Sequence, residues 1–197
     1  MTRLRTEILT GDAARAHLDD LARLRIAVFR EYPYLYDGDS DYERRYLVPY
    51  AESAGGVVVA AFDGDSVVGA ATGLPLSDAP DSVAAPFKAV GVDPATVFYL
   101  GESVLLPEYR GRGIGHAFFD AREAHARALG LAMCAFCAVV RPADHPDRPA
   151  DWRPLDGFWT ARGYTARPDM QTTFTWRDID APAETAKPMR FWLRPLR

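Results

Sequence analysis

The sequence predicts a mixed α/β fold in which a mostly antiparallel central sheet is flanked by helices. Short runs rich in β-branched and aromatic residues alternate with longer runs whose apolar residues recur at helical spacing. Two β-rich runs, 56–62 and 67–72, are separated by a segment that contains Asp63-Gly64, a dipeptide typical of tight hairpins and therefore of antiparallel pairing. A strand-loop-helix-strand unit follows over residues 97–140.

The N-terminal part is predicted to contain one strand and two helices. Residues 3–9 form the strand, and Gly11-Asp12 starts a helix through Val28 whose apolar residues lie at helical spacing. We expect this helix to pack one face on the sheet. A loop rich in tyrosine and aspartate, residues 31–42, leads into a second helix that ends near Glu52.

The central unit starts with a short helix near residues 83–90 and an apolar strand over 97–106. Gly101 interrupts this strand, which indicates a bulge or the close approach of another backbone. After Pro107 and a glycine-rich loop, a helix is predicted with Glu123 and Arg127 on its outer side and with Gly130 as its C-cap. Its apolar face consists of Ile114, Ala117, Phe118, Ala121, Ala124 and Ala128.

The remaining elements are a buried strand at 131–140, a short helix at 155–162 capped by Gly163, and two closing strands at 171–176 and 189–196. Nothing repeats and no stretch has the composition of a flexible linker, so we expect residues 1–197 to form a single domain. The run 187–196 is apolar enough for an edge strand or a homodimer contact, and the oligomeric state stays open.

Composition and charge limit the classes of function that the protein can have. The chain has 197 residues, 48% of them apolar, and a formal charge of -4, so we expect a globular protein with no nucleic-acid partner. No apolar run approaches the roughly 18 residues of a membrane span, and the N-terminus lacks an apolar signal core, so we expect no membrane association and a cytoplasmic location.

Cys134 and Cys137 are the only cysteines. They lie three residues apart in a predicted strand, so their side chains point to opposite faces. That geometry disfavours both a metal pair and a redox-active loop, and we expect two buried structural thiols and no metal cofactor.

The loop Arg110-Gly111-Arg112-Gly113-Ile114-Gly115 is the most informative motif. It joins a strand to the start of a helix, where unpaired N–H groups and the helix dipole favour an anion. Alternate glycines suit a nest of main-chain donors, and the arginines add charge. A Walker loop is disfavoured because His116 follows Gly115, and the dinucleotide spacing is absent. The plainer alternative is a glycine-rich turn with two solvated arginines.

This segment resembles the acyl-CoA signature of the GNAT superfamily of N-acetyltransferases. The pattern Arg/Gln-x-x-Gly-x-Gly/Ala is matched by Arg110, Gly113 and Gly115, after the apolar strand end and proline of Leu105-Leu106-Pro107 and an aromatic residue, Tyr109. The order of elements from residue 3 to 176 is similar too. The resemblance implies the acyl-CoA N-acyltransferase fold with acetyl-CoA as co-substrate.

The resemblance also implies positions for acetyl-CoA. The strand residues Val104, Leu105 and Leu106 would offer main-chain groups to the pantetheine and thioester, and the amide of Leu105 or Leu106 would polarise the thioester carbonyl. The pyrophosphate would be wrapped by Arg110, Gly111, Arg112, Gly113, Ile114, Gly115 and His116.

Glu102 is the predicted base, because members of the superfamily often carry a glutamate on this strand and because burial would raise its pKa or demand a partner. Alternatively it faces out or pairs with an arginine for structural reasons. His145 is a second candidate. The tyrosine that usually supplies the acid is replaced by Trp159. Tyr164 is the predicted substitute, with Tyr99 or a water as alternatives.

The acceptor is expected under the first two helices and the loop between them, as in the resembled superfamily. Tyr34 and Tyr36 are predicted to bind it, because tyrosine faces with acids nearby suit an ammonium group. An ordinary surface loop or an oligomer contact is the alternative.

The expected function is N-acetylation of a primary amine, on a small molecule or peptide, by direct attack in a ternary complex, since no Cys or Ser lies in a nucleophile arrangement. The alternatives are a non-catalytic acyl-CoA sensor and an interaction module that binds no CoA.

Overall fold

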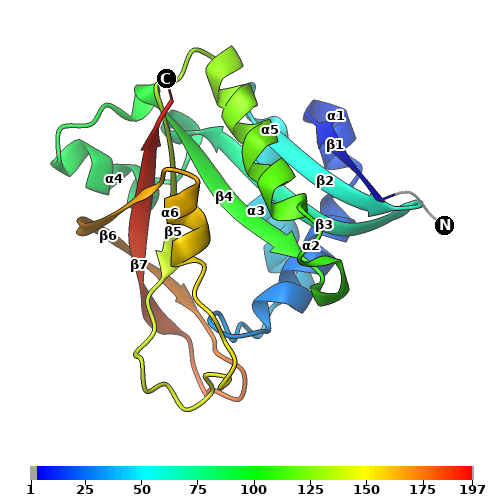
Figure 1. Ribbon diagram of the computed structural model, residues 1–197, viewed down its shortest axis with the longest axis vertical. Helices are drawn as coiled ribbons and strands as arrows, with labels where there is room; N and C mark the ends of the chain where they lie inside the picture. Colours follow the sequence, from blue (N-terminus) through cyan, green and yellow to red (C-terminus); the bar gives the residue numbers. More distant parts are fainter. Residues whose placement is uncertain (1–3, 197) are drawn as a thin grey trace.

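The hairpin around Asp63-Gly64 is the start of a larger sheet. In a computed structural model that describes residues 4–196, seven strands lie in the order β1-β2-β3-β4-β5-β7-β6 (Figure 1). Every neighbouring pair is antiparallel except β4–β5, which confirms the mixed fold. The strands are β1 (Leu4–Leu9), β2 (Val57–Asp63), β3 (Ser66–Pro75), β4 (Val97–Leu105), β5 (Met133–Val139), β6 (Thr165–Trp176) and β7 (Thr185–Pro195).

The parallel pair β4–β5 is short. It runs only from Val97 opposite Met133 to Tyr99 opposite Ala135, although β4 continues to Leu105 and β5 to Val139. The two strands diverge beyond this point (Figure 1). Their carboxyl ends therefore leave an opening in the middle of the sheet.

Helices cover both faces of the sheet. On one face lie α2 (Leu18–Phe29), which contacts β3 and β4, and α3 (Ser40–Glu52), which contacts β2 and β3. On the other lies α5 (Ile114–Ala128), which contacts β2, β3 and β4 (Figure 1). The shorter helices are α1 (Gly11–Arg15), α4 (Asp81–Ala89) and α6 (Asp156–Ala161).

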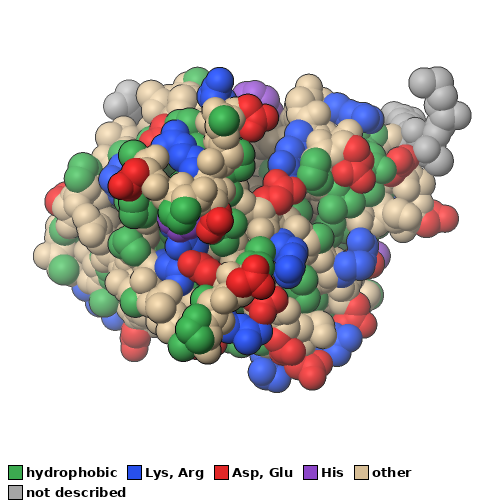
Figure 2. Space-filling view, turned by 90° about the horizontal axis from the view of Figure 1, so that it is seen from below, with side chains coloured by type: hydrophobic (Ala, Val, Ile, Leu, Met, Phe, Trp, Pro, Cys, Tyr) green, Lys and Arg blue, Asp and Glu red, His purple; other side chains and the backbone are tan. Residues whose placement is uncertain are grey.

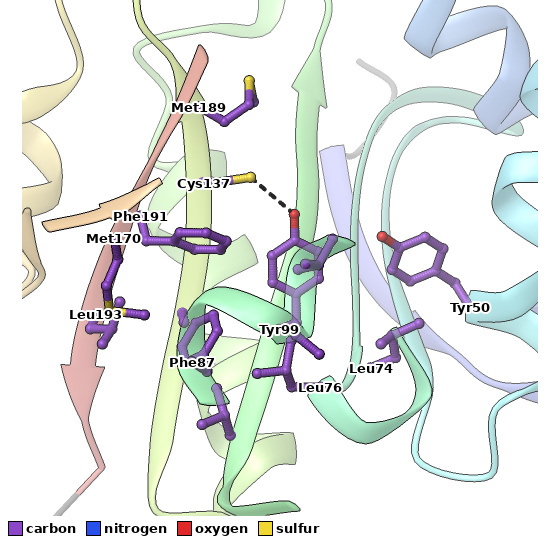
Figure 3. Packing of buried hydrophobic residues seen from close by; sticks show 14 of the residues in the cluster. Tyr50, Leu74, Leu76, Phe87, Tyr99, Cys137, Met170, Met189, Phe191 and Leu193 are labelled. Atoms are coloured by element: carbon purple, nitrogen blue, oxygen red, sulfur yellow. Dashed lines mark hydrogen bonds between the residues drawn. The ribbon is translucent and has the colours of Figure 1, made fainter. Parts of the chain in front are cut away.

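Strand β2 shows how the core is divided. Val57, Val59 and Ala61 pack into the cluster under α5, and the alternate residues Val58, Ala60 and Phe62 pack under α2 and α3. This is the period of two expected of a strand covered on both faces. A third cluster, around Phe87 and Phe191, closes the β5–β7–β6 side of the opening (Figure 3).

The prediction of two buried cysteines on opposite faces is confirmed, because Cys134 packs in the cluster under α5 and Cys137 in the one around Phe87. Both thiols are buried and unoxidised. Burial raises the pKa of each to about 12, so neither is an activated thiolate.

Three sequence predictions are wrong. The first helix is two helices, α1 and α2, separated at residues 16–17. The run 187–196 is no edge, because β7 pairs with β5 on one side and β6 on the other. Glu123 does not lie on the outside of α5: it is buried and ion-paired with Arg162 and Arg194, whereas Ala124 and Ala128 are exposed.

Within residues 4–196 no helix is long and apolar enough to cross a membrane. In the same part of the chain, no group of three or more His, Cys, Asp or Glu is placed to hold a metal ion. Acidic and basic side chains are interspersed on the face seen in Figure 2, and no broad basic area appears on it.

Candidate active site

The predicted interruption of β4 at Gly101 is a β-bulge. Ala71 pairs with Ser103 and Gly73 with Leu100, so Gly101 and Glu102 together oppose Thr72. A Cβ at residue 101 would lie 2.3 Å from Tyr50 Oη and 2.5 Å from Thr72 Oγ1. Glycine is required because these two side chains, rather than another backbone, come close.

Arg122 of α5 holds this bulge in place. Its side chain is buried, and Nη1 donates to the main-chain carbonyls of Thr72 and Glu102, both at 3.0 Å. Its Nε donates to the Phe118 carbonyl at 3.1 Å and its Nη2 to Ser103 Oγ at 2.7 Å. Burial among uncharged acceptors lowers the pKa of Arg122 to about 10, although nearby acidic groups oppose the shift.

Glu102 is buried and paired. Its side chain is 4% exposed, and Oε2 lies 2.7 Å from Nη1 of Arg25. The same guanidinium bonds Glu43 through Nε, so one arginine joins two carboxylates. Burial raises the pKa of Glu102, and the Arg25 charge opposes that rise only in part. Glu102 therefore pairs with an arginine and keeps a raised pKa beside it, and its role as a base stays a prediction.

Glu102 lies where two cavities meet. One has a volume of about 970 Å³ and fills the opening between β4 and β5; the other, of about 450 Å³, lies beneath α2 and α3. Phe29, Tyr34, Gly101, Glu102 and Cys137 line both. A carboxylate here can face groups that arrive through either cavity.

The glycine loop lines the larger cavity. Gly111 (φ 74°) and Gly113 (φ 82°) adopt the left-handed conformation that favours glycine, and Gly113 is the N-cap of α5. Residues Arg110, Gly111, Gly113, Gly115 and His116 line this cavity, so the first turn of α5 faces it.

Two predicted loop residues have other roles. The Ile114 side chain is buried in the core under α5. Arg112 lies over the Tyr109 ring and donates to the Glu108 carbonyl at 2.8 Å. Neither lines a cavity.

Arg110 is already engaged within the chain. It forms a two-point ion pair with Glu31, with N–O distances of 2.8 and 3.1 Å, and its Nε donates to the Leu105 carbonyl at 3.1 Å. Glu31 belongs to the segment after α2. The pair therefore links the glycine loop to the segment that covers both cavities.

The register of β4 distinguishes the three predicted main-chain donors. Leu106 N–H donates to the Val68 carbonyl at 3.0 Å, so the sheet already uses that amide. Along an antiparallel strand, successive main-chain N–H groups alternately face the partner strand and point away from it. The Val104 N–H therefore also faces β3, as the Leu106 N–H does. The Leu105 N–H points away from β3, toward the larger cavity, which Leu105 lines. Of these three residues, Leu105 is the one whose main-chain donor is left for a ligand.

Many of the side chains that line the smaller cavity are aromatic. Tyr46 Oη and Tyr50 Oη lie 3.2 Å apart, and Tyr99 Oη lies 3.3 Å from Cys137 Sγ; Tyr50, Tyr99 and Cys137 are drawn in Figure 3. Six tyrosines of the described chain line it: Tyr34, Tyr36, Tyr42, Tyr46, Tyr50 and Tyr99. Both tyrosines predicted to bind the acceptor are therefore in this cavity.

The aspartates of the 31–42 segment do not line this cavity. Asp37 pairs with Arg30 and Arg177, Asp39 caps α3 through Tyr42 N–H, and Asp41 lies beside Arg44. The acidic side chains that line the smaller cavity are instead Glu43 and Glu102.

Two predicted proton-transfer residues do not reach the cavities. Tyr164 is 2% exposed in the core under α5 and donates to Glu123 Oε1 at 3.0 Å. His145 packs against Tyr32 and accepts from Asp147 N–H at 3.2 Å. Neither lines either of the two cavities, so their positions do not support the predicted roles. Tyr99, the alternative acid, does line the smaller cavity.

Sequence reasoning missed Arg25 and Glu43. A signal was present, because Arg25 lies four residues after Leu21 and Glu43 four before Leu47, and both leucines are buried. A charged residue at helical spacing within an apolar stripe indicates a buried ion pair.

Comparison with known proteins identifies the family of this chain. The model of the acetyltransferase (GNAT) family matches residues 19–149, about two thirds of the chain. The chain belongs to the GNAT family of acetyltransferases. GNAT membership supports acyl transfer from acetyl-CoA in general.

Solved GNAT structures show the same fold. Ribosomal-protein-alanine N-acetyltransferase from Brucella melitensis superposes with a TM-score of 0.62 at 14% identity, over 98% of this chain and 99% of the other. The yncA structure from Salmonella typhimurium, which contains its cofactor acetyl-CoA, gives 0.61 at 12% identity, over 98% and 94%. No curated protein matches the sequence.

Proposed function

We propose that this protein transfers an acetyl group from acetyl-CoA to a primary amine of a small molecule or peptide. Glu102 at the junction of the two cavities is the observation that carries the proposal. Acetyl-CoA occupies the larger cavity and the amine the smaller one. The transfer then takes place in a ternary complex, by direct attack of the amine on the thioester.

The larger cavity suits acetyl-CoA in shape and charge. The N-terminus of α5 with its left-handed glycines offers main-chain donors for the pyrophosphate. Leu105 N–H faces the cavity and is the donor we assign to the thioester carbonyl oxygen.

Glu102 is suited to remove the proton of the attacking amine. Only a neutral amine attacks a thioester, and a carboxylate whose pKa is raised by burial holds that proton better than an exposed one. The Tyr99 hydroxyl lies 3.3 Å from Sγ of Cys137, a residue that lines both cavities, so we assign Tyr99 rather than Tyr164 to protonation of the departing thiolate.

The competing function is a non-catalytic acyl-CoA sensor. Trp159 favours it, because this residue lines the larger cavity where the superfamily usually has its acidic tyrosine. A sensor keeps the acetyl-CoA cavity but consumes no thioester.

The test is release of free CoA from acetyl-CoA across a panel of primary amines, with Glu102→Gln as the variant. We expect kcat to fall about 100-fold or more, with acetyl-CoA affinity within about twofold. Glu108→Gln, an exposed glutamate outside both cavities, is the matched control. Acetyl-CoA binding without turnover of any amine would establish the sensor instead.

A further inference from the structure

The smaller cavity has an unbalanced set of charges. Among the described residues that line it, the charged side chains are Arg25, Glu43 and Glu102. One guanidinium faces two carboxylates, so the ionised cluster carries one excess negative charge. Two further cations lie close by but are engaged elsewhere. Arg122 lines the other cavity and gives its hydrogen bonds to main-chain carbonyls and Ser103. Lys187, over the Trp176 ring, pairs with Asp178.

Each carboxylate has one buried oxygen without a hydrogen bond of ordinary geometry from the described chain, but Oε2 of Glu102 still lies 2.7 Å from Arg25 Nη1, so Glu43 is the less satisfied of the two. Its side chain is 0% exposed, and Oε2 accepts from Arg25 Nε. The other oxygen, Oε1, is buried and accepts no hydrogen bond of ordinary geometry from the described chain. Burial, and after it hydrogen bonding to the Glu43 carboxylate, raise the pKa of the Tyr36 hydroxyl, so Tyr36 is a neighbouring donor that a ligand would join. A buried carboxylate oxygen that lacks a well-formed hydrogen bond is costly, so a charged donor from a ligand would be favoured at Oε1.

The rings around Glu43 suit a cationic group. The guanidinium of Arg25 lies 4.1 Å from the centre of the Tyr46 ring and 4.9 Å from that of Phe29, so aromatic faces here already contact one cation. Tyr36 and Tyr42 line the same cavity. An ammonium group beside Glu43 would therefore meet a carboxylate oxygen and aromatic rings together.

The spacing of the two carboxylates is fixed by the protein. Glu43 extends from α3 and Glu102 from β4, and both contact the guanidinium of Arg25, Glu43 through Nε and Glu102 through Nη1. Glu102 also faces the larger cavity, whereas Glu43 lines only the smaller one. A ligand with two cationic groups a few bonds apart can meet one carboxylate with each.

On the basis of the proposed acetyl transfer, we propose that the acceptor is a compact diamine whose second ammonium binds Glu43. The reacting amine lies at Glu102 and loses its proton there, and the other amine stays charged against Oε1 of Glu43. The volume of about 450 Å³ suits a small molecule. A carboxylate in place of the second ammonium would be repelled by the excess negative charge.

The experiment compares isosteric acceptors with the full-length protein and acetyl-CoA. Putrescine and cadaverine are measured against n-pentylamine and n-hexylamine, in which a methyl group replaces the second ammonium, and against ω-aminocarboxylates of similar length. We expect kcat/KM to be at least about 10-fold higher for each diamine than for its monoamine, the value of a charged hydrogen bond. The aminocarboxylates should be the poorest acceptors.

Glu43→Gln tests the assigned residue. The ratio of diamine to monoamine kcat/KM should fall close to one, because an amide cannot neutralise the ammonium. Glu52→Gln, an exposed glutamate at the end of α3, should keep the wild-type ratio. Since Glu43 also holds Arg25, Tm and acetyl-CoA affinity are recorded for both variants.

The outcomes separate the two proposals. Monoamines acetylated as well as diamines by the wild-type protein would overturn the diamine inference and leave acetyl transfer intact, even if Glu43→Gln fails to fold. If no amine in the panel releases CoA, acetyl transfer itself is the proposal that fails.

Discussion

Arg122 donates a hydrogen bond of 3.0 Å to the main-chain carbonyl of Glu102. The donor belongs to α5, whose first turn faces the larger cavity, and the acceptor belongs to the bulge that carries the candidate base. The same Nη1 also bonds Thr72 on β3. The helix assigned to the pyrophosphate and the strand that carries the base are thus joined by one buried side chain.

Replacing Arg122 with Met should destabilise the protein and disturb the bulge. The carbonyls of Phe118, Thr72 and Glu102 would lose a buried donor, and we expect the free energy of unfolding to fall by about 3 kcal/mol. Urea denaturation measures this. The exposed Arg127 of the same helix supplies the control, Arg127→Met, with a change within about 0.5 kcal/mol. Equal losses in the two variants would show that Arg122 does not hold the bulge.

Adding one methyl group at Gly101 should also damage the bulge. The new Cβ would lie 2.3 Å from Tyr50 Oη and 2.5 Å from Thr72 Oγ1, so one strand or side chain has to move. We expect Gly101→Ala to lower the free energy of unfolding by about 1–3 kcal/mol and to reduce kcat. Gly157→Ala in α6, where a Cβ meets nothing within 4 Å, should be neutral or stabilising. An unchanged Tm for Gly101→Ala would argue against this packing.

Local signals predicted much of the fold and the larger cavity. Asp63-Gly64 marks a hairpin within a few residues, and the loop from Arg110 to Gly115 lies between a strand and its following helix, so both are visible in short windows of sequence. The bulge at Gly101 was also local.

Features that depend on distant partners could not be predicted in the same way. Glu123 is buried because Arg162 and Arg194 pair with it from positions far along the chain. The place of β7 inside the sheet depends on β6 returning beside it. Arg25 comes from α2, Glu43 from α3 and Glu102 from β4, and only the fold brings them together.

The charge at the start of α5 offers a test of the acetyl-CoA cavity. A Cβ at Gly115 would lie 3.7 Å from Phe158, an ordinary contact, so Gly115→Ala should fold and bind acetyl-CoA with little change. Gly115→Glu adds a carboxylate where we place the pyrophosphate and should weaken binding about 10-fold or more. Calorimetry with acetyl-CoA measures both. Equal affinities would place the pyrophosphate elsewhere.

The two tyrosine candidates for the acid should respond differently. Tyr164 lines neither cavity and donates to Glu123, so Tyr164→Phe should cost about 1–3 kcal/mol of stability while kcat stays within about twofold. Tyr99 lines the smaller cavity beside Cys137, and Tyr99→Phe should lower kcat with little effect on acetyl-CoA affinity. Steady-state kinetics beside thermal melts separate the effects. A larger loss of kcat for Tyr164→Phe would reverse our assignment.

The raised pKa of Glu102 predicts the pH dependence of the reaction. A base must be ionised, so kcat/KM should fall as pH drops through the pKa of Glu102, which burial places above the usual value of about 4.3. Glu102→Gln should lack this acid limb. Acceptors of different basicity serve as the control. If the fall in kcat/KM at low pH comes from protonation of the amine, its midpoint shifts with the pKa of the acceptor. If it comes from protonation of Glu102, its midpoint stays the same for all acceptors.

The raised pKa of Glu102 also predicts how the free energy of unfolding changes with pH. A folded-state pKa above the unfolded value means that the proton on Glu102 stabilises the fold below the unfolded pKa, and that this contribution is lost as pH rises through the folded pKa. The free energy of unfolding of Glu102→Gln relative to wild type should therefore increase with pH across this range. Urea denaturation at a series of pH values checks it. A difference that decreases with pH would mean that Arg25 outweighs burial and lowers the pKa of Glu102.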